Sequence, residues 1–376
     1  MNNVTAMGII FANLHDANVA EVTDKRTMAS VPFAGRYRMI DFVLSGMARA
    51  GMRNIGIMVR RNYQSLMDHL GSGREWDLSR KRGGLAIFPP HDRDSDERSG
   101  QGRRLETLNL AMGYLSYCTD ELVILSDCDI AHNLDFSDLI TAHVESGADV
   151  TAVYDRGEIT GGLQQDNVVF KLNAGGQATQ LRVNDYQSGP QNLSMHIYVL
   201  RRDLLVQIVR DAIVQGMPSF ETDFLAQSLK TLQVQGYEYT GYRARIYDMQ
   251  SYFAENMRLL EGDNLSRLFL PGRPVYTKVS DTAPARYAMG SSVTHSLLGD
   301  GCVIEGRVEN CVLFRNVRVG KGALLQNCVV MQGSVIEDGA QLANVVTDKN
   351  VAVRAGRTMC GTSGYPVFVS KGAVVE

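Results

Sequence analysis

The chain has 376 residues, of which 44% are hydrophobic and 21% charged, and a formal net charge of -3. This length is too great for one ordinary domain and favours two, and the composition is typical of a soluble globular protein with a large core. The nearly balanced charge gives no reason to expect nucleic acid as a partner. No apolar run reaches the length of a membrane span, so no membrane partner is expected either.

Cysteine usage and the amino terminus both favour the cytoplasm. The six cysteines form no Cys-x-x-Cys pair and no cluster with histidine, as expected for reduced, mostly buried thiols. The first residues, Met1-Asn-Asn-Val-Thr, lack the basic region that opens a signal peptide. We therefore expect a cytoplasmic protein.

The first 155 residues alternate between strand-like and helix-like runs. This alternation predicts an α/β domain, a mostly parallel sheet with helices on both faces. The expected strands are 5–12, 53–59, 121–127 and 149–155, and the expected helices are 38–50, 103–117 and 136–147.

The loop from Phe11 to Gly35 follows the first expected strand, at the sheet edge where open α/β sheets bind ligands. A nucleotide triphosphate there needs backbone that can approach it closely, which favours glycine, and cationic side chains. There is no glycine between Gly8 and Gly35, and the first arginine is Arg26. Taken alone, the segment is interpreted as an ordinary polar loop. The basic clusters at 60–61, 80–82 and 103–104 are likewise interpreted as solvated surface, because acidic residues lie nearby.

Further along, a strand is expected at 195–200 and helices at 202–215, 220–232 and 249–262. Pro271, Pro274 and Pro284 then interrupt a stretch without helical period, which is typical of an interdomain linker. We place a first domain at 1–265, the linker at 266–288 and a second domain at 289–376.

The second domain contains a 17-residue repeat. Four columns of the repeat coincide: Asn310, Asn327 and Asn344; Val312, Val329 and Val346; Val319, Ile336 and Val353; and Gly322, Gly339 and Gly356. The repeat is rich in valine, glycine and asparagine, so each copy should be one coil of a parallel β-helix. It resembles the left-handed hexapeptide β-helix, with asparagine supplying a left-handed corner. Because a solenoid has open ends, we expect an oligomerisation element rather than only a structural appendage.

Two long segments carry a resemblance to a known family. Residues 31–45, Val-Pro-Phe-Ala-Gly-Arg-Tyr-Arg-Met-Ile-Asp-Phe-Val-Leu-Ser, and residues 69–84, His-Leu-Gly-Ser-Gly-Arg-Glu-Trp-Asp-Leu-Ser-Arg-Lys-Arg-Gly-Gly, are similar to motifs of the glucose-1-phosphate adenylyltransferases. Further similar segments follow in the family's order over essentially the whole chain. The resemblance implies a GT-A-like nucleotidyltransferase domain followed by the β-helix.

The resemblance gives the opening loop a different meaning. Read without a gap, the family's phosphate-binding glycines fall on Asn13, Leu14 and Asp16, its arginine on Asn18 and its lysine on Met28. In the family that arginine and lysine face the triphosphate, where positive charge stabilises the leaving group. We therefore expect no catalytic residues here.

The sugar-phosphate side is also altered. The family's phosphate-binding lysine has no counterpart, since no lysine lies between Lys171 and Lys230. The family's Thr-Ala-Asp element is missing from the corresponding segment, 98–106. No cofactor-binding residue is therefore predicted with confidence, and no cofactor is required.

A remnant of the family's metal site involves three aspartates: Asp127 and Asp129 after a sheet strand, and Asp248. Carboxylates at a strand end could hold Mg²⁺, if a residual nucleotide site survives. The alternative interpretation, which we favour, is that they are relics held by hydrogen bonds.

The resemblance is closest to the GlgD type, the catalytically deficient regulatory paralogue of this family. It implies a catalytic glucose-1-phosphate adenylyltransferase subunit as partner in a mixed tetramer. Lys25 and Arg26 match a pair beside the effector-responsive region and are candidates for sensing a phosphorylated metabolite. Two alternatives stay open: an active metal-dependent sugar nucleotidyltransferase with a rebuilt site, and a purely structural homo-oligomer.

Overall fold

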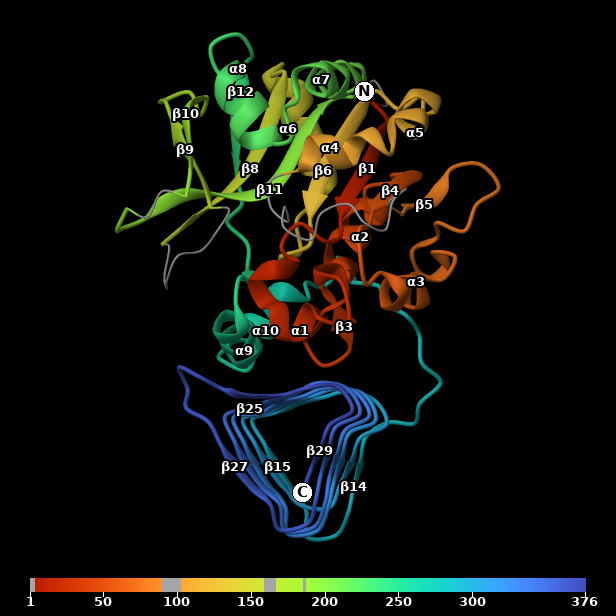
Figure 1. Cartoon of the computed structure of the whole chain (residues 1–376), viewed down its shortest axis with the longest axis vertical. Coiled ribbons are helices and arrows are strands. Elements are labelled where there is room, and N and C mark those ends of the chain that lie inside the picture. Colours follow the sequence, from red (N-terminus) through yellow and green to blue (C-terminus); the bar gives the residue numbers. More distant parts are fainter. Residues whose placement is uncertain (1–3, 90–102, 159–166, 185–186) are drawn as a thin grey trace.

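The computed structural model describes residues 4–89, 103–158, 167–184 and 187–376. An α/β domain built on one large sheet lies above a triangular β-helix, and the chain passes from the first to the second through an extended segment (Figure 1). None of the described helices is long and apolar enough to cross a bilayer. The predicted α/β domain and left-handed parallel β-helix are confirmed, and the hexapeptide character of the second domain is supported by comparison below.

The large sheet has a parallel part and an antiparallel part. Strand β1 (Ala6–Phe11) is parallel to its neighbours on both sides, while β11 runs antiparallel to β6 and β8. The order is β10-β9-β11-β6-β1-β4-β5, with β8 paired to β11 and β12. The other bounds are β4 (Asn54–Met58), β5 (Gly84–Phe88), β6 (Leu122–Asp127), β8 (Val150–Gly157), β9 (Val168–Leu172), β10 (Ala178–Val183), β11 (Gln191–Arg201) and β12 (Val234–Glu238).

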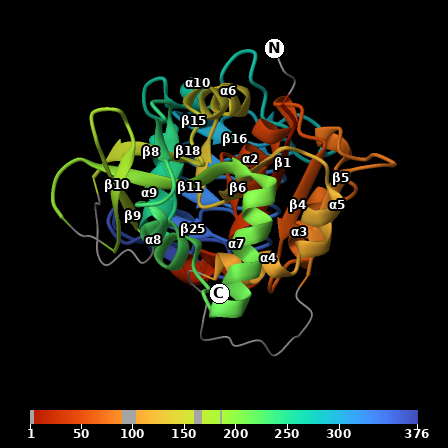
Figure 2. The same cartoon turned by 90° about the horizontal axis from the view of Figure 1, so that it is seen from above.

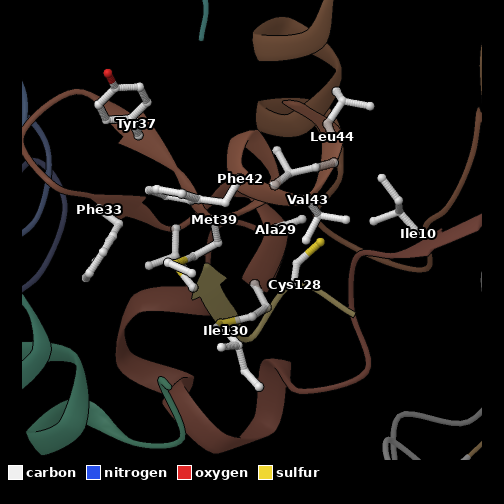
Figure 3. Packing of buried hydrophobic residues seen from close by; sticks show 14 of the residues in the cluster. Ile10, Ala29, Phe33, Tyr37, Met39, Phe42, Val43, Leu44, Cys128 and Ile130 are labelled. Atoms are coloured by element: carbon white, nitrogen blue, oxygen red, sulfur yellow. The ribbon is translucent and has the colours of Figure 1, made fainter. Parts of the chain in front are cut away.

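Helices cover both faces of this sheet (Figure 2). Alternate residues of β1 point to opposite faces, so Ile10 joins the core under α2 while Ile9 joins the core under α4, α5 and α7. Figure 3 shows the first of these cores, where Ile10, Phe42 and Val43 surround Cys128. The helices are α2 (Met39–Arg49), α4 (Arg104–Asn109), α5 (Met112–Tyr117), α6 (Phe136–Ser146) and α7 (Arg202–Gln215).

Two expected helices differ from the structure. The single helix predicted over 103–117 is two short helices, α4 and α5, separated at residues 110–111. The helix predicted over 220–232 is a π-helical turn (Phe220–Leu225) that continues into α8 (Ala226–Ser228). Both interruptions lie beside Arg104 and Glu221, which form a buried ion pair. Helical geometry is therefore broken where charged side chains turn inward, and π-helical turns are frequent at functional sites.

The remaining elements of the α/β domain surround the carboxyl edge of the sheet. They are two short hairpin-like pairs and several short helices: β2 (Pro32–Phe33) with β3 (Tyr37–Arg38), β7 (Ile130–His132) with β13 (Arg243–Arg245), the 3-10 turns Asp16–Val19, Met28–Ser30 and Arg74–Trp76, α1 (Ala20–Thr23), α3 (Gln64–Leu70), α9 (Met249–Arg258) and α10 (Asn264–Leu268).

The β-helix consists of three parallel sheets whose strands stack coil on coil. One sheet has the order β14-β17-β20-β23-β26-β29, the second β15-β18-β21-β24-β27 and the third β16-β19-β22-β25-β28. Their bounds are β14 (Arg286–Tyr287), β15 (Ser292–Thr294), β16 (Leu297–Leu298), β17 (Val303–Ile304), β18 (Arg307–Glu309), β19 (Val312–Leu313), β20 (Arg318–Val319), β21 (Leu324–Gln326), β22 (Val329–Val330), β23 (Val335–Ile336), β24 (Gln341–Ala343), β25 (Val345–Thr347), β26 (Ala352–Val353), β27 (Thr358–Cys360), β28 (Val367–Val369) and β29 (Val374–Val375).

The predicted repeat is confirmed in register. Val312 pairs with Val329 and Val329 with Val346, so the valine column stacks inside the coils. The asparagine column adopts the left-handed backbone, with φ of 51°, 51° and 54° at Asn310, Asn327 and Asn344. The sequence interpretation of these asparagines as corners was therefore correct.

Asn327→Ala should lower the free energy of unfolding by about 1–2 kcal/mol, because alanine resists a left-handed backbone. The substitution also removes the hydrogen bond that Asn310 Nδ2 donates to Asn327 Oδ1 at 2.6 Å. Urea unfolding measures the effect. Asn327→Gly should be milder, since glycine tolerates this φ, and the exposed Gln326→Ala should change stability little. Equal losses from alanine and glycine would contradict a backbone origin.

The two domains share a continuous apolar core. Val312, Phe314, Val329, Met331 and Val346 of the β-helix belong to the same buried cluster as the α2 side of the large sheet. The chain between α10 and β14 also lies against the first domain, where the Tyr276 N–H donates to Ser45 Oγ at 2.8 Å. Loop residues near the carboxyl edge of the sheet are therefore fixed partly by the β-helix.

Candidate functional site

The loop after β1 closes on itself around a buried carboxylate. Asp16, 3% exposed, accepts hydrogen bonds from the Asn13 side chain at 2.5 Å and from the Met28 backbone N–H at 2.7 Å. Asn13 accepts a hydrogen bond from the Arg60 backbone N–H at 2.9 Å, which ties the loop to the end of β4. Burial raises the pKa of Asp16 to about 7, although its hydrogen bonds oppose the shift. The loop thus supplies an internal acceptor for a backbone N–H of the kind that cradles phosphate.

The other family positions of the loop offer no positive charge. Leu14 is buried against a cavity, the Met28 side chain is buried in the core, and Asn18 is half-buried. These positions, with Asn13 and Asp16, are neutral or acidic. A triphosphate entering here would meet no cation from the loop positions that supply one in the similar family.

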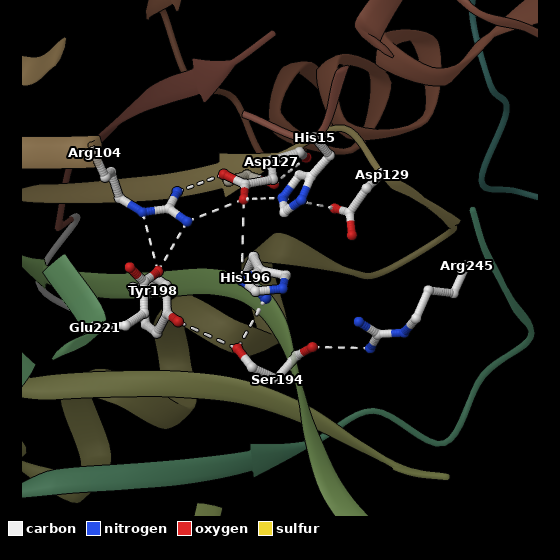
Figure 4. A network of polar contacts seen from close by, with 10 residues as sticks. His15, Arg104, Asp127, Asp129, Ser194, His196, Tyr198, Glu221 and Arg245 are labelled. Atoms are coloured by element: carbon white, nitrogen blue, oxygen red, sulfur yellow. Dashed lines mark hydrogen bonds and ion pairs between the residues drawn. The ribbon is translucent and has the colours of Figure 1, made fainter. Parts of the chain in front are cut away.

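Strand β6 ends at Asp127, whose carboxylate binds Arg104 through both oxygens (Figure 4). Arg104 also contacts Glu221 Oε1 at 2.9 Å, and its guanidinium lies 4.7 Å from the ring centroid of Phe11. Burial alone would lower the pKa of Arg104, but Asp127 and Glu221 together raise it. Arg104 is therefore a permanent buried cation between two carboxylates.

Two histidines approach Asp127 from the side opposite Arg104 (Figure 4). His15 Nε2 lies 2.8 Å from Asp127 Oδ2 and 3.8 Å from Asp129 Oδ1, while His196 Nδ1 lies 4.0 Å from Asp127 Oδ2. His196 lies where the register of β11 shifts, and its φ of 54° is in the left-handed region. Burial alone would raise the pKa of Asp127, but Arg104 and His15 hold it below its usual range.

Sequence reasoning missed three residues of this cluster. The interpretation of Arg103 and Arg104 as solvated surface was wrong for Arg104, which is 3% exposed, while Arg103 remains on the surface paired with Glu106. His15 and His196 were not singled out, because no local spacing connects them. Of the expected sugar-phosphate segment 98–106, residues 98–102 lie outside the described residues.

The three predicted metal ligands do not form one site. Asp248 is the N-cap of α9, and its Oδ1 accepts the Ser251 backbone N–H at 2.6 Å. Asp127 already accepts from Arg104 and His15, and Asp129 lies on the far side of His15. A Mg²⁺ ion prefers near-octahedral oxygen ligands, so Asp127, Asp129 and Asp248 as arranged here do not fit it.

A cavity of about 340 Å³ opens beside the cluster. Its wall combines the charged groups with hydroxyl and amide side chains; the lining residues are Leu14, His15, Arg104, Asp127, Val168, Val183, Asn184, His196, Pro218, Ser219, Glu221, Thr222 and Asp223. The site predicted at the strand ends therefore exists as a hollow, although its charge differs from the family's.

The structure separates the two effector candidates. Lys25 is exposed, with its Nζ 2.8 Å from Asp24 Oδ2. Arg26 is 1% exposed and binds both carboxylate oxygens of Asp348 in the β-helix, at 2.6 and 2.9 Å. The expectation that Arg26 senses an effector is corrected, because its guanidinium is already bound to Asp348 and closed to solvent.

A second, basic pocket of about 200 Å³ lies between the two domains. Its wall carries five cationic side chains, Arg36, Arg38, Lys278, Arg315 and Lys349, together with His69 and backbone from both domains. Burial, aided by repulsion from Arg38 and Arg26, lowers the pKa of Lys349 to about 7. Such a concentration of positive charge would bind an anion favourably.

Comparison with known proteins agrees with this architecture. Residues 18–239 match the family model described as nucleotidyl transferase, and residues 282–363 match the GlmU-like C-terminal hexapeptide model. The chain is 36% identical to the "Glycogen biosynthesis protein GlgD" of Bacillus subtilis (strain 168), over 100% of this chain and 98% of that protein. It is also 36% identical to the protein of that name from Geobacillus stearothermophilus, over 86% and 84% of the two chains.

Similarity to named enzymes is lower. A "Glucose-1-phosphate adenylyltransferase" of Clostridium botulinum (strain Alaska E43 / Type E3) is 27% identical over 87% of this chain and 84% of its own. Both domains and nearly the full length are thus shared with the GlgD relatives. The chain belongs to the nucleotidyl transferase family, in the group that contains the GlgD glycogen biosynthesis proteins.

Proposed function

We propose that this chain serves glycogen biosynthesis as a catalytically deficient regulatory subunit of glucose-1-phosphate adenylyltransferase. It would act in the cytoplasm, in a mixed tetramer with a catalytic subunit. The observation that carries the proposal is the loop after β1, in which Asp16 occupies a backbone N–H and Asn18 and Met28 stand where the similar family has cations.

The loss of chemistry follows from electrostatics. Nucleotidyl transfer to a sugar phosphate requires cations that stabilise the pyrophosphate as it leaves. Here the buried cation nearest the strand ends, Arg104, is bound to Asp127 and Glu221. Its charge is compensated, so it cannot replace both missing cations of the loop.

A regulatory role is supported by the basic pocket between the domains. The pocket joins residues 36–38, next to the β1–β2 loop, to Lys349 of the β-helix. A phosphorylated metabolite bound there would contact both domains and could favour one arrangement of the subunit over another. This pocket replaces Lys25 and Arg26 as our proposed effector site.

The decisive experiment assays ADP-glucose synthesis by this chain alone, by the catalytic subunit alone and by the two co-expressed. We expect the chain to co-purify with the catalytic subunit and to change its rate or its response to effectors. Synthesis by this chain alone at an ordinary enzymatic rate would refute the proposal. Failure to co-purify would instead favour a structural homo-oligomer.

Sulfate binding to the basic pocket should weaken as pH rises above about 7. Lys349 is then deprotonated in the free protein, and sulfate, which keeps its charge, must bring a proton with it; the affinity should fall by up to about tenfold per pH unit. Calorimetry at several pH values measures this. Lys349→Gln should bind weakly and without this pH dependence, whereas the exposed Lys321→Gln should behave as the parent. An unchanged pH dependence in Lys349→Gln would place the binding elsewhere.

A second candidate function, active nucleotidyl transfer through a rebuilt site, is favoured by the cavity beside Asp127. Binding of a nucleotide sugar there should raise the thermal stability in a metal-dependent way. No shift with any nucleotide at high concentration would count against it.

A further inference from the structure

The buried cluster at the end of β6 contains a ligand set that the family's oxygen-only metal site does not explain. Within the described residues, His15, Asp127 and His196 each offer one ligand atom, and these atoms lie within 4.8 Å of one another. All three residues are at most 6% exposed. Two neutral imidazoles and one carboxylate suit zinc and its first-row neighbours, whereas Mg²⁺ prefers oxygen.

Two polar atoms of the cluster have no hydrogen bond in the part of the chain that the structure describes. They are His196 Nδ1 and Asp129 Oδ1, and both are buried. His196 is 4% exposed, and its Nδ1 is the nitrogen nearest Asp127 Oδ2. Buried polar atoms are rarely left unpaired unless a ligand or an ion completes them.

The backbone at His196 is also unusual. A residue with a Cβ resists a φ of 54°, a position that glycine would occupy without strain. The register shift of β11 at this point turns the imidazole towards His15, so that the ring centroids are 5.2 Å apart. Strained residues of this kind concentrate at functional sites.

The charges around His196 leave room for a divalent cation. Its electrostatic neighbours include Asp127, Asp129 and Glu221, and Arg104 is the cation bound to two of them. Three carboxylates and one arginine sum to a formal charge of -2 when both histidines are neutral. Burial lowers the pKa of His196, which favours the neutral imidazole that a metal requires.

We propose that His15, Asp127 and His196 bind one zinc-like divalent transition-metal ion. Ligand atoms about 2.0–2.1 Å from a tetrahedral zinc lie roughly 3.3 Å apart, and the distances of 2.8 Å and 4.0 Å bracket this value. The ion displaces the proton between His15 Nε2 and Asp127 Oδ2, while Arg104 keeps holding Asp127 Oδ1 as an orienting partner. The remaining coordination position faces the 340 Å³ cavity and would accept an oxygen of a bound molecule.

Titration of the metal-stripped full chain with Co²⁺ tests the proposal, because Co²⁺ bound by imidazole and carboxylate absorbs visible light. All samples carry Cys360→Ser, since Cys360 is the exposed cysteine. We expect one equivalent of Co²⁺ per chain, displaced by Zn²⁺ and resistant to a large excess of Mg²⁺. His196→Gly and His15→Gln should each lower the affinity by more than the roughly 10- to 100-fold typical of losing an outer partner.

His196→Gly is well suited to this test, because glycine fits the local backbone and the variant should fold at least as well as the parent. A matched control is His295→Gly, which makes the same change at an exposed histidine with φ of 47° on the β-helix and should leave Co²⁺ binding unchanged. Circular dichroism confirms folding of each variant. Absence of a saturable Co²⁺ site, its persistence in both His15→Gln and His196→Gly, or its displacement by comparable Mg²⁺ would each overturn the proposal. None of these outcomes bears on the subunit role proposed above.

Discussion

Arg26→Met should lower the free energy of unfolding by about 3–5 kcal/mol, the cost of leaving a buried carboxylate without its partner. Arg26 and Asp348 are 1% and 3% exposed, and the guanidinium holds both oxygens of the carboxylate across the domain interface. Methionine is chosen because it fills much of the same volume without charge. The loss should appear in urea unfolding.

The double variant Arg26→Met, Asp348→Asn separates pairing from packing. Asparagine removes the unpaired charge but keeps an oxygen that can accept the Lys349 backbone N–H, now bound to Asp348 Oδ1 at 2.6 Å. It should therefore recover much of the stability lost in Arg26→Met. Lys25→Met, at the exposed neighbouring position, should change stability by less than about 0.5 kcal/mol. If the double variant were no more stable than Arg26→Met, the missing packing would explain the loss instead.

This ion pair also gives the β-helix a physical connection to the altered loop. Arg26 lies between α1 and the 3-10 turn that begins at Met28, whose N–H binds Asp16. Asp348 is next to Lys349 in the basic pocket. An anion that binds Lys349 therefore lies one residue from the carboxylate that fixes the loop, which supports the proposed regulatory use of the pocket.

Local patterns predicted the scaffold well because each one reports burial within a few residues. The first strand was expected at 5–12 and spans Ala6–Phe11, and the valine and asparagine columns of the β-helix pair in the expected register. The period itself varies where no column was recognised. Coils are 15 residues long from β15 to β18, since Ser292 pairs with Arg307, and 22 residues long from β25 to β28, since Val345 pairs with Val367.

The site was predicted less well because its partners are distant in sequence. Arg104 pairs with residues 23 and 117 positions away, and Arg26 with a residue 322 positions away, so their local sequence resembles that of ordinary surface arginines. His196 is recognisable only from its backbone. Asp248 did carry a usable signal: a serine three positions later is compatible with a reciprocal helix cap, which is what the structure contains.

The chain purified alone should make ADP-glucose with a kcat/KM at least about 10⁴-fold below that of its catalytic partner. Removing one group that stabilises developing charge typically costs about 10²- to 10³-fold, and here two cations are absent, at Asn18 and Met28. The assay requires a host without an adenylyltransferase of its own. As a matched control, removing the aligned arginine and lysine from the catalytic subunit should produce a loss of similar size.

Returning these two cations, with Asn18→Arg and Met28→Lys together, should restore only a small part of the activity. Asp16 would still hold the backbone N–H of residue 28, and its burial would place a carboxylate where phosphate must approach. Asp127 would still be bound by Arg104, so the strand end could not take part in phosphate or metal binding as in an oxygen-only site. Recovery to within about tenfold of the catalytic subunit would mean that the two missing cations alone explain the deficiency. Little recovery would show that Asp16 and Arg104 have remade the site, because an internal carboxylate and an internal guanidinium then do the binding that substrate and metal would otherwise do.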